Sequence, residues 1–233
     1  MSVWAIVPAA GSGQRFGAGS PKQYQMAAGQ PLLAHVLDLL LTATGIEGLV
    51  LATAASDTRW HDCVPKNNGR KLIAVTGGAT RAASVRAALS ALEGMAVADD
   101  WALVHDAARP CLAPQDLSRL LVELHDDPVG GLLAAPVVDT LKRGDESGHV
   151  TATEKRDGLW RALTPQMFRY GLLSSALDGA LDAGVEVTDE ACAMEWAGHT
   201  PRLVSGGVDN VKVTRAEDLA LAEAILSARV IKS

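Results

Sequence analysis

The chain has 233 residues, of which 48% are hydrophobic and 21% charged, and these proportions are ordinary for a soluble globular protein. Its net charge of −6 argues against a broad nucleic-acid or membrane surface, although a few focused cations could still hold a small anion. The apolar runs are too short to span a bilayer, the first residues lack a secretory signal, and the three cysteines form no metal-ligand pattern, so we expect a reduced, cytoplasmic protein.

The first part of the chain alternates short apolar runs with an amphipathic window. Residues 3–8 ("VWAIVP") predict a buried strand, which a glycine-rich loop over residues 8–24 follows. Residues 31–41 carry leucine and valine side chains at helical spacing and predict a helix. Two further strands are expected over residues 48–53 and 71–78.

The same alternation continues along the middle of the chain. Residues 81–92 predict a helix, and residues 101–110 predict a strand that ends in an acid and then turns. Residues 113–124 predict a helix with Pro114 at its first position, where the missing N–H of proline is tolerated. Residues 130–140 predict another strand.

The last helix is expected to start at Thr214, where Thr214 and Glu217 would form a capping box. Strands that alternate with helices imply crossover connections, and these produce a parallel sheet with both faces covered. We therefore predict a single α/β domain over residues 1–233, with a Rossmann-like, mainly parallel sheet and helices on both faces.

The segment 139–160 breaks the alternation because it is polar throughout and has a Gly-Asp-Glu-Ser-Gly turn at its middle. Two β-prone halves around such a turn predict a hairpin, and neither face is apolar enough to pack on the core. We expect a protruding β-hairpin arm. A hairpin alone is marginally stable, so an ordered arm implies support from a partner chain, and a disordered surface loop is the alternative.

The loop "PAAGSGQRFGAGSPKQY" (8–24) follows the first strand, at the sheet edge where parallel α/β proteins bind ligands. Its glycines would let backbone N–H groups approach a phosphate. It lacks the Gly-Lys-Ser/Thr end of a Walker loop, and its third glycine is one residue late for the dinucleotide-binding fingerprint. Residues 1–37 contain no acidic residue, and their only formal charges are Arg15 and Lys22, as expected for a local anion site. The alternative is a turn with two solvated cations.

Seven stretches decide between these interpretations. The chain carries, in this order, "PAAGSGQRFGAGSPKQY", "GGATRAASV", "VHDAARP", "DTLK", "RDGLWRALTPQMF", "TDEA" and "DNVKVTRAEDLALAE". Together they resemble the family of 2-C-methyl-D-erythritol 4-phosphate cytidylyltransferases, over about residues 3–228. The resemblance implies a nucleotidyltransferase fold, CTP and a polyol phosphate as substrates, and a homodimer joined through the arm.

The resemblance also implies roles for individual residues. The catalytic cations would be Arg15 and Lys22, which act on the triphosphate, and Arg156 and Lys212, which position the acceptor phosphate. The positions that bind CTP would be Ala9, Ala10, Gly11, Gly13, Gly78, Ser84 and Asp106. The acceptor pocket would be lined by Thr140, Thr164, Thr188 and again Asp106. Thr140 and Arg156 lie on the arm, which would reach the neighbouring subunit's site.

The implied reaction agrees with the residue types present. An ionised acceptor phosphate would attack the α-phosphorus of CTP, so no strong general base is needed, and the sequence shows no Ser-His-Asp or Cys-His pattern. Cations would offset the charge that builds up at phosphorus. No carboxylate cluster is spaced as a metal cage, so Mg²⁺ is expected to be held mainly by the phosphates of CTP and by no dedicated protein site.

Each assignment has a structural alternative. Asp106 could cap the turn that follows its strand, and Thr164 before Pro165 could cap a helix. Thr188 could cap the helix "DEACAMEWA", Lys212 could be a solvated strand residue, and His105 is expected to be a core histidine.

Two other functions remain open at this point. One is a cytidylyltransferase that acts on ribitol 5-phosphate, and the other is a non-catalytic nucleotide-binding regulatory module.

Overall fold

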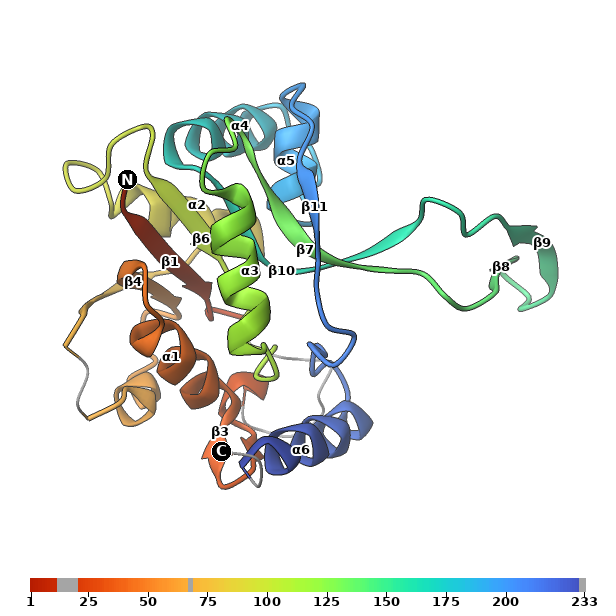
Figure 1. Cartoon of the computed structure of the whole chain (residues 1–233), viewed down its shortest axis with the longest axis horizontal. Helices are drawn as coiled ribbons and strands as arrows, with labels where there is room; N and C mark the ends of the chain where they lie inside the picture. The colour runs from red at the N-terminus through yellow and green to blue at the C-terminus, as the bar shows by residue number, and fades with distance from the viewer. Residues whose placement is uncertain (12–20, 67–68, 231–233) are drawn as a thin grey trace.

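The structure is a computed structural model that describes residues 1–11, 21–66 and 69–230. Its core is a seven-stranded sheet with the strand order β11-β7-β10-β6-β1-β4-β5 (Figure 1). The strands of this sheet are β1 (Val3–Pro8), β4 (Ile46–Thr53), β5 (Lys71–Thr76), β6 (Trp101–Val104), β7 (Gly130–Pro136), β10 (Trp160–Arg169) and β11 (Arg202–Ser205). Strand β1 pairs in parallel with β4 and β6, as β4 does with β5 and β11 with β7, whereas β10 runs antiparallel to β6 and β7. The mainly parallel sheet is thereby confirmed.

Helices cover both faces of this sheet. Successive side chains of a buried strand point to opposite sides, so each strand supplies apolar side chains to both faces. Ala5 and Val7 of β1 belong to one apolar cluster, while Trp4 and Ile6 belong to the other. The first cluster is completed by α1 (Leu32–Thr42) and α3 (Pro114–Leu124). The second is completed by α2 (Arg81–Ser90), α4 (Tyr170–Asp182) and α5 (Glu190–Trp196). None of the helices in the described ranges combines the length and the apolar character needed to cross a bilayer.

Smaller elements complete the lower part of the molecule as Figure 1 shows it. The helix α6 (Ala216–Val230) packs through Ala222 and Leu226 on a third cluster, which includes Ala27 and Leu32. The strands β2 (Met26–Ala27) and β3 (Gln30–Pro31) form a small hairpin beside it. Two short 3-10 helices cover Lys22–Tyr24 and Arg59–Cys63.

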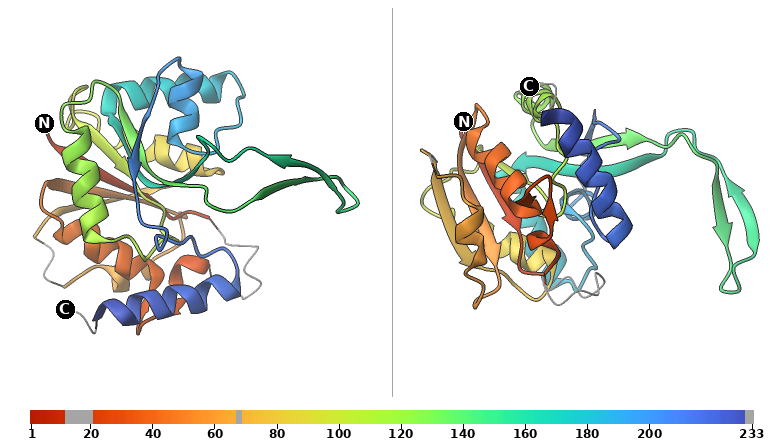
Figure 2. Two further views of the ribbon diagram at one scale, coloured as in Figure 1. Left: turned by 45° about the vertical axis from the view of Figure 1, so that its right-hand side comes forward. Right: turned by 90° about the horizontal axis from the view of Figure 1, so that it is seen from below.

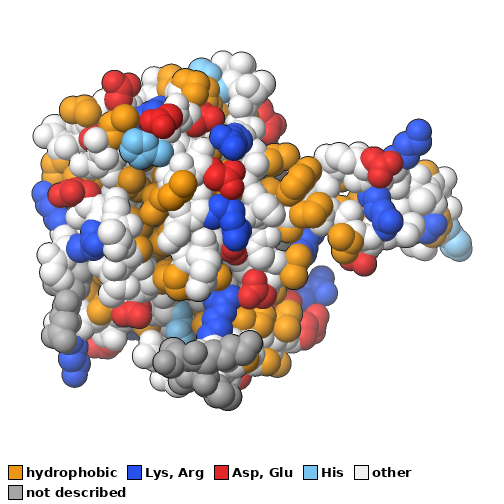
Figure 3. Space-filling model, viewed as in Figure 1, with side chains coloured by type: hydrophobic (Ala, Val, Ile, Leu, Met, Phe, Trp, Pro, Cys, Tyr) orange, Lys and Arg blue, Asp and Glu red, His pale blue; other side chains and the backbone are white. Residues whose placement is uncertain are grey.

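The predicted arm is confirmed as a hairpin of β8 (Leu141–Gly144) and β9 (Val150–Glu154), which pair antiparallel. It projects well away from the sheet and its helices (Figures 1 and 2). Charged side chains lie along it (Figure 3), and Arg143 pairs with Glu154 across the hairpin at 2.6 Å. Large apolar side chains at its root are exposed, with Val138 at 69%, Leu159 at 42% and Trp160 at 39%.

The sequence-based predictions of three strands and one helix ran past the observed ends. Strand β5 stops at Thr76, β6 at Val104 and β7 at Pro136, and α2 ends at Ser90. After β6 the chain turns, and the Arg109 N–H donates to the Asp106 carbonyl oxygen at 3.0 Å. Residues beyond these ends can still continue the backbone pairing, since the Val137 N–H donates to the Leu159 carbonyl oxygen at 3.0 Å.

The capping box predicted at Thr214 is absent, and neither Thr164 nor Thr188 takes the alternative role of a helix cap. Helix α6 begins at Ala216, and Thr214 donates its N–H and hydroxyl to Asp218 Oδ2 at 2.8 and 2.6 Å instead of pairing with Glu217. Thr164 lies inside β10, followed by a cis peptide bond to Pro165, so it caps no helix. For α5 the cap is Asp189 rather than Thr188, because Asp189 Oδ1 accepts the Cys192 N–H at 2.9 Å.

Candidate functional site

A cavity of about 400 Å³ opens where the parallel strands β1, β5 and β6 end. Backbone hydrogen bonds hold the loops around it on the sheet, since Ala9 donates to the Ala52 carbonyl oxygen at 2.7 Å and Gly77 to the Thr53 carbonyl oxygen at 2.8 Å. The Gln23 side chain donates to the carbonyl oxygen of Ala9 at 2.9 Å. The residues that line the cavity are Pro8, Ala9, Ala10, Gly11, Lys22, Gln23, Gly78, Ala79, Thr80, Arg81, Ser84, Asp106, Ala107, Ala108 and Lys212.

The wall between β5 and α2 depends on two glycines. A Cβ on Gly77 would lie 2.5 Å from the Ala10 Cβ, and a Cβ on Gly78 would lie 2.5 Å from the Ala83 Cβ. Thr80 then caps α2, because its Oγ1 accepts the Ala83 N–H at 3.1 Å. The absence of these two side chains lets residues 77–78 pack closely against the loop after β1 on one side and the start of α2 on the other.

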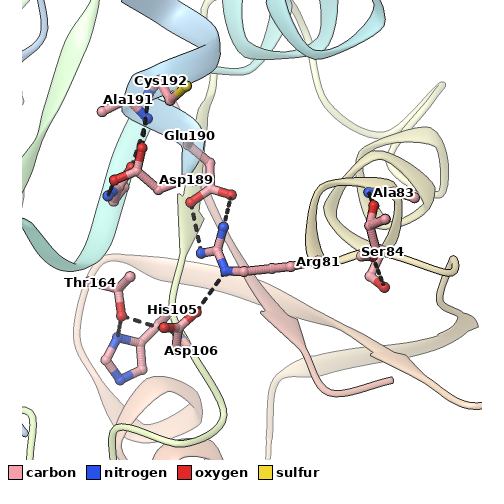
Figure 4. Close-up of polar contacts among 12 residues, drawn as sticks. Arg81, Ala83, Ser84, His105, Asp106, Thr164, Asp189, Glu190, Ala191 and Cys192 are labelled. Carbon is pink, nitrogen blue, oxygen red and sulfur yellow. Dashed lines mark hydrogen bonds and ion pairs between the residues drawn. The ribbon is translucent and has the colours of Figure 1, made fainter. Parts of the chain in front are cut away.

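Charged side chains meet at the other wall (Figure 4). Arg81 donates from Nε to Asp106 Oδ1 at 2.8 Å, and from Nη1 and Nη2 to the two oxygens of Glu190 at 2.7 and 2.9 Å. Lys212 Nζ lies 2.8 Å from Asp106 Oδ2. Burial alone would raise the pKa of Asp106, but the Arg81 guanidinium and the Lys212 ammonium hold that pKa well below its usual range. The carboxylate therefore stays ionised between two cations, and Lys212 is no solvated strand residue.

Beneath Asp106 lies a fully buried histidine, as expected. Burial lowers the pKa of His105 to about 4, so its ring is neutral at pH 7. The His105 Nε2 lies 3.0 Å from the Arg109 carbonyl oxygen and must donate to it, which leaves Nδ1 to accept the Thr164 hydroxyl proton at 2.9 Å. Thr164 Oγ1 accepts the Asp106 N–H at 3.1 Å, so this threonine supports the backbone of Asp106 and caps no helix.

Most of the residues expected in the site surround the cavity. Those that line it are Ala9, Ala10, Gly11, Lys22, Gly78, Ser84, Asp106 and Lys212. Thr164 is buried behind this lining, and Thr188 is exposed just before α5. Thr140 and Arg156 lie on the projecting arm, where Arg156 Nη1 donates to the Val138 carbonyl oxygen. Arg15 and Gly13 lie outside the described residues.

Arg81 and Glu190 are charged residues of this site that were given no role from the sequence. A signal for Arg81 existed, since a cation in the first turn of a helix is disfavoured by the helix dipole and needs an acidic partner. Glu190 gave no such signal, because an acid in the first turn of a helix is ordinary. Its partner is 109 residues away in sequence.

The fit of a metal ion to this site can be judged from its carboxylates. Within the described residues, no group of three or more His, Cys, Asp or Glu side chains is placed to hold a metal ion. Asp106, the acid that faces the cavity, has both oxygens paired with cations. The described walls therefore suit an anion that brings its own cation better than they suit a resident metal.

Comparison with known proteins identifies the family. The family model described as IspD, 2-C-methyl-D-erythritol 4-phosphate cytidylyltransferase, matches residues 3–228. A protein of that name from Stenotrophomonas maltophilia strain K279a is 53% identical over 231 residues, which are 98% of each chain. One from Dechloromonas aromatica is 54% identical over 227 residues, covering 97% of this chain and 98% of that one.

Solved structures agree with this match. A crystal structure of a 4-diphosphocytidyl-2C-methyl-D-erythritol synthase has a TM-score of 0.83 and 36% identity, and it covers 97% of this chain and 98% of its own. The Francisella tularensis IspD structure has a TM-score of 0.82 and 31% identity, with coverage of 97% and 100%. The chain therefore belongs to the IspD family of 2-C-methyl-D-erythritol 4-phosphate cytidylyltransferases.

Proposed function

We propose that this protein transfers a cytidylyl group from CTP to 2-C-methyl-D-erythritol 4-phosphate and releases pyrophosphate, in the non-mevalonate route to isoprenoid precursors. The observation that carries the proposal is the family membership, which holds over nearly the whole length of this chain and of its relatives. The cavity at the strand ends supports it, because glycine-rich backbone and the cations Lys22 and Lys212 line it together.

CTP would bind along the wall formed by the loop after β1 and the start of α2. Ala9, Ala10 and Gly11 would face the nucleotide from one side, with Gly13 further along the loop. Gly78 and Ser84 would face it from the other side, where the Ser84 hydroxyl donates to the Thr80 carbonyl oxygen at 2.9 Å. A nucleotide fits such a wall because closely placed backbone can hydrogen-bond a base and ribose with little side-chain bulk.

The reaction forms a bond between an oxygen of the acceptor phosphate and the α-phosphorus of CTP, and it breaks the bond from that phosphorus to pyrophosphate. The acceptor monoester has a second pKa of about 6, so it attacks already ionised. Lys22 and Arg15 would stabilise the charge that develops on the triphosphate, and Lys212 would hold the attacking phosphate. Asp106, fixed between two cations, would orient Lys212 and the ribose side of the site.

Magnesium would assist as a partner of the substrate. Mg²⁺ commonly binds through phosphate oxygens and retained waters rather than through an all-protein cage. When bound, it would neutralise part of the triphosphate charge. The residues of this chain that would face that complex are Lys22 and Arg15 from the loop after β1.

The acceptor side of the site would be completed by a second copy of the chain. Thr140 and Arg156 belong to the arm, which projects away from the sheet (Figure 2), and neither lines the cavity of its own chain. The arm's root exposes Val138, Leu159 and Trp160, as is common where a partner chain covers a surface. We therefore propose a two-fold homodimer in which each arm brings Arg156 to the partner's acceptor phosphate.

Two threonines of the proposed acceptor pocket differ in how they would act. Thr188 is exposed at the start of α5 and would contact the polyol directly. Thr164 has its hydroxyl proton committed to His105, so it would act through the backbone N–H of Asp106.

We place the enzyme in the cytoplasm, in keeping with the unpaired state of Cys63, Cys111 and Cys192.

A substrate panel tests the proposal. Pyrophosphate release is measured with CTP, UTP or ATP, each combined with 2-C-methyl-D-erythritol 4-phosphate or ribitol 5-phosphate. We expect release with CTP and the methylerythritol phosphate to exceed every other pair by at least an order of magnitude. Preference for ribitol 5-phosphate would mean that ribitol 5-phosphate is the acceptor substrate. CTP binding without pyrophosphate release would indicate a non-catalytic nucleotide-binding module.

A further inference from the structure

A carboxylate that does not line this cavity lies behind the site. Glu190, in the first turn of α5, is 0% exposed and is not among the residues that line the cavity. Burying an ionised carboxylate is costly unless it is paired and hydrogen-bonded. Both of its oxygens accept from Arg81, at 2.7 and 2.9 Å (Figure 4). This two-bond pairing is strong and fixes the plane of the guanidinium.

The position of Glu190 is itself fixed by the centre of the sheet. Gln166 of β10, which is 1% exposed, donates from Nε2 to Asp189 Oδ2 at 2.9 Å and accepts the Ala191 N–H at 2.8 Å. Asp189 also caps α5 through the Cys192 N–H. The residues on both sides of Glu190 are thus tied to one buried side chain, so its carboxylate has little freedom to follow Arg81.

Arg81 passes this constraint to the cavity wall. Its Nη1 and Nη2 are used by Glu190, which leaves Nε for Asp106 Oδ1 at 2.8 Å. The second oxygen of Asp106 is left for Lys212 at 2.8 Å. A chain of ion pairs therefore runs from α5 through α2 and the end of β6 to the segment that carries Lys212.

Three cations compete for Asp106, since Arg109 Nε also lies 3.7 Å from Oδ2 and has no hydrogen-bond partner within the described structure. Arginine can bind both oxygens of one carboxylate at once. Without Glu190, Arg81 could turn its free nitrogens to Asp106 and displace Lys212 from Oδ2. The pairing with Glu190 prevents this.

We propose that Glu190 is a positioning residue that acts through Arg81 and Asp106 to set the place of Lys212 beneath the acceptor phosphate. This inference rests on the proposed function, because that function gives Lys212 its acceptor. It predicts a defect that is selective for one substrate. The acceptor side should suffer most, because Lys212 loses its partner. Asp106 itself keeps its charge and the support of its backbone N–H by Thr164, and the CTP wall of Ala9–Gly11 and Gly78 is untouched, so CTP binding should change little.

The kinetic test uses Glu190→Gln, which keeps the shape of the side chain and removes its charge. The matched control is Glu195→Gln, on the exposed side of the same helix. With CTP and 2-C-methyl-D-erythritol 4-phosphate, we expect Glu190→Gln to lose about 10- to 100-fold in kcat/KM for the acceptor, the scale of one charge-assisted contact. The KM for CTP should stay within about two-fold of wild type, and Glu195→Gln should behave as wild type.

A merely structural role for Glu190 gives a different result. It would lower Tm and the number of active sites, but the folded fraction would keep the wild-type KM for both substrates, and this outcome would overturn the proposal. Combining Glu190→Gln with Lys212→Gln distinguishes the positioning role of Glu190 from a merely structural role in a second way. The double variant should lose little more than Lys212→Gln alone, whereas additive losses would contradict the chain of ion pairs.

A crystal structure of the Glu190→Gln protein without substrates tests the link independently of turnover. We expect Lys212 Nζ to move out of hydrogen-bond distance of Asp106 Oδ2, with Arg81 bound to both Asp106 oxygens. An unchanged Lys212–Asp106 contact would overturn the proposal. If Glu190→Gln does not fold, Glu190→Asp replaces it, because the shorter carboxylate cannot hold both Arg81 nitrogens in the same place, which frees them for Asp106 and should cause the same acceptor-selective defect. If the wild-type protein does not turn over CTP and 2-C-methyl-D-erythritol 4-phosphate, the proposed function is refuted. The crystal structure of the variant would still decide whether Glu190 sets the place of Lys212.

Discussion

The buried imidazole of His105 predicts that the folded protein loses stability as the pH falls from 7 to 5. The ring is 0% exposed, and burial lowers its pKa to about 4 from an ordinary value of 6.5. Between these two values the unfolded chain takes up a proton that the folded chain does not. The free energy of unfolding therefore falls as the pH falls through this window, and the contribution is fully present above about pH 6.5.

The size of the effect follows from the two pKa values. Each unit of difference corresponds to about 1.4 kcal/mol, so the full loss at pH 4 and below approaches about 3 kcal/mol. At pH 5 the loss should be about 2 kcal/mol, which is a substantial share of the stability of an ordinary domain. Carboxylates with lowered pKa values, such as Asp106, add their own loss only below about pH 4.

The assay is urea unfolding at pH 7, 6 and 5 for the wild type and for His105→Gln, which removes the titrating ring. The variant should be less stable at pH 7, because the hydrogen bonds of His105 to Thr164 and Arg109 are disturbed. All other ionisable groups are the same in both proteins, so their effects cancel in the difference. That difference should narrow by about 2 kcal/mol between pH 7 and pH 5. A gap that stays constant over this range would refute the reasoning.

Three further predictions concern the proposed reaction. Lys22→Ala should lower kcat by about 100-fold or more with little change in Tm, and near-normal turnover would contradict its role. Titration calorimetry should detect little Mg²⁺ binding in the absence of CTP, whereas tight binding to the protein alone would require a resident site. Lys22→Ala and Arg156→Ala, unfolded and refolded together, should recover about a quarter of wild-type activity, because half of the dimers are mixed and each has one intact site. Activity no higher than that of either variant alone would mean that Arg156 serves its own subunit.

The elements that the sequence predicts well are those whose signal is local. Apolar periodicity found β1, α1 and α3 because each buries one face or both faces against the same sheet. Thr164 shows where this reasoning stops. A Thr-Pro pair resembles a helix start, but Thr164 is bound to Asp106 and His105, 58 and 59 residues earlier, and these contacts belong to the middle of β10.

The residues of the candidate site also differ in whether a local sequence signal predicts them. The glycine-rich loop and Asp106 could be placed from the sequence because both follow strands that end at one edge of a parallel sheet. Lys212 depends on long-range contacts, since Asn210 donates to the Thr164 carbonyl oxygen at 2.7 Å and Val213 to the Ala108 carbonyl oxygen at 2.8 Å. No periodicity encodes such contacts, so only the family resemblance singled out Lys212 from the sequence.

The central claim is that the acceptor phosphate attacks the α-phosphorus of CTP, and isotope transfer tests it most directly. The acceptor is prepared with ¹⁸O in its phosphate group and incubated with CTP, Mg²⁺ and the enzyme, and the products are examined by ³¹P NMR and mass spectrometry. Attack at the α-phosphorus predicts that all of the label stays in the product in which a diphosphate joins cytidine to the methylerythritol. One labelled oxygen should bridge its two phosphorus atoms, and none should appear in pyrophosphate. Label in pyrophosphate, or CMP formed with an oxygen from water, would contradict the account.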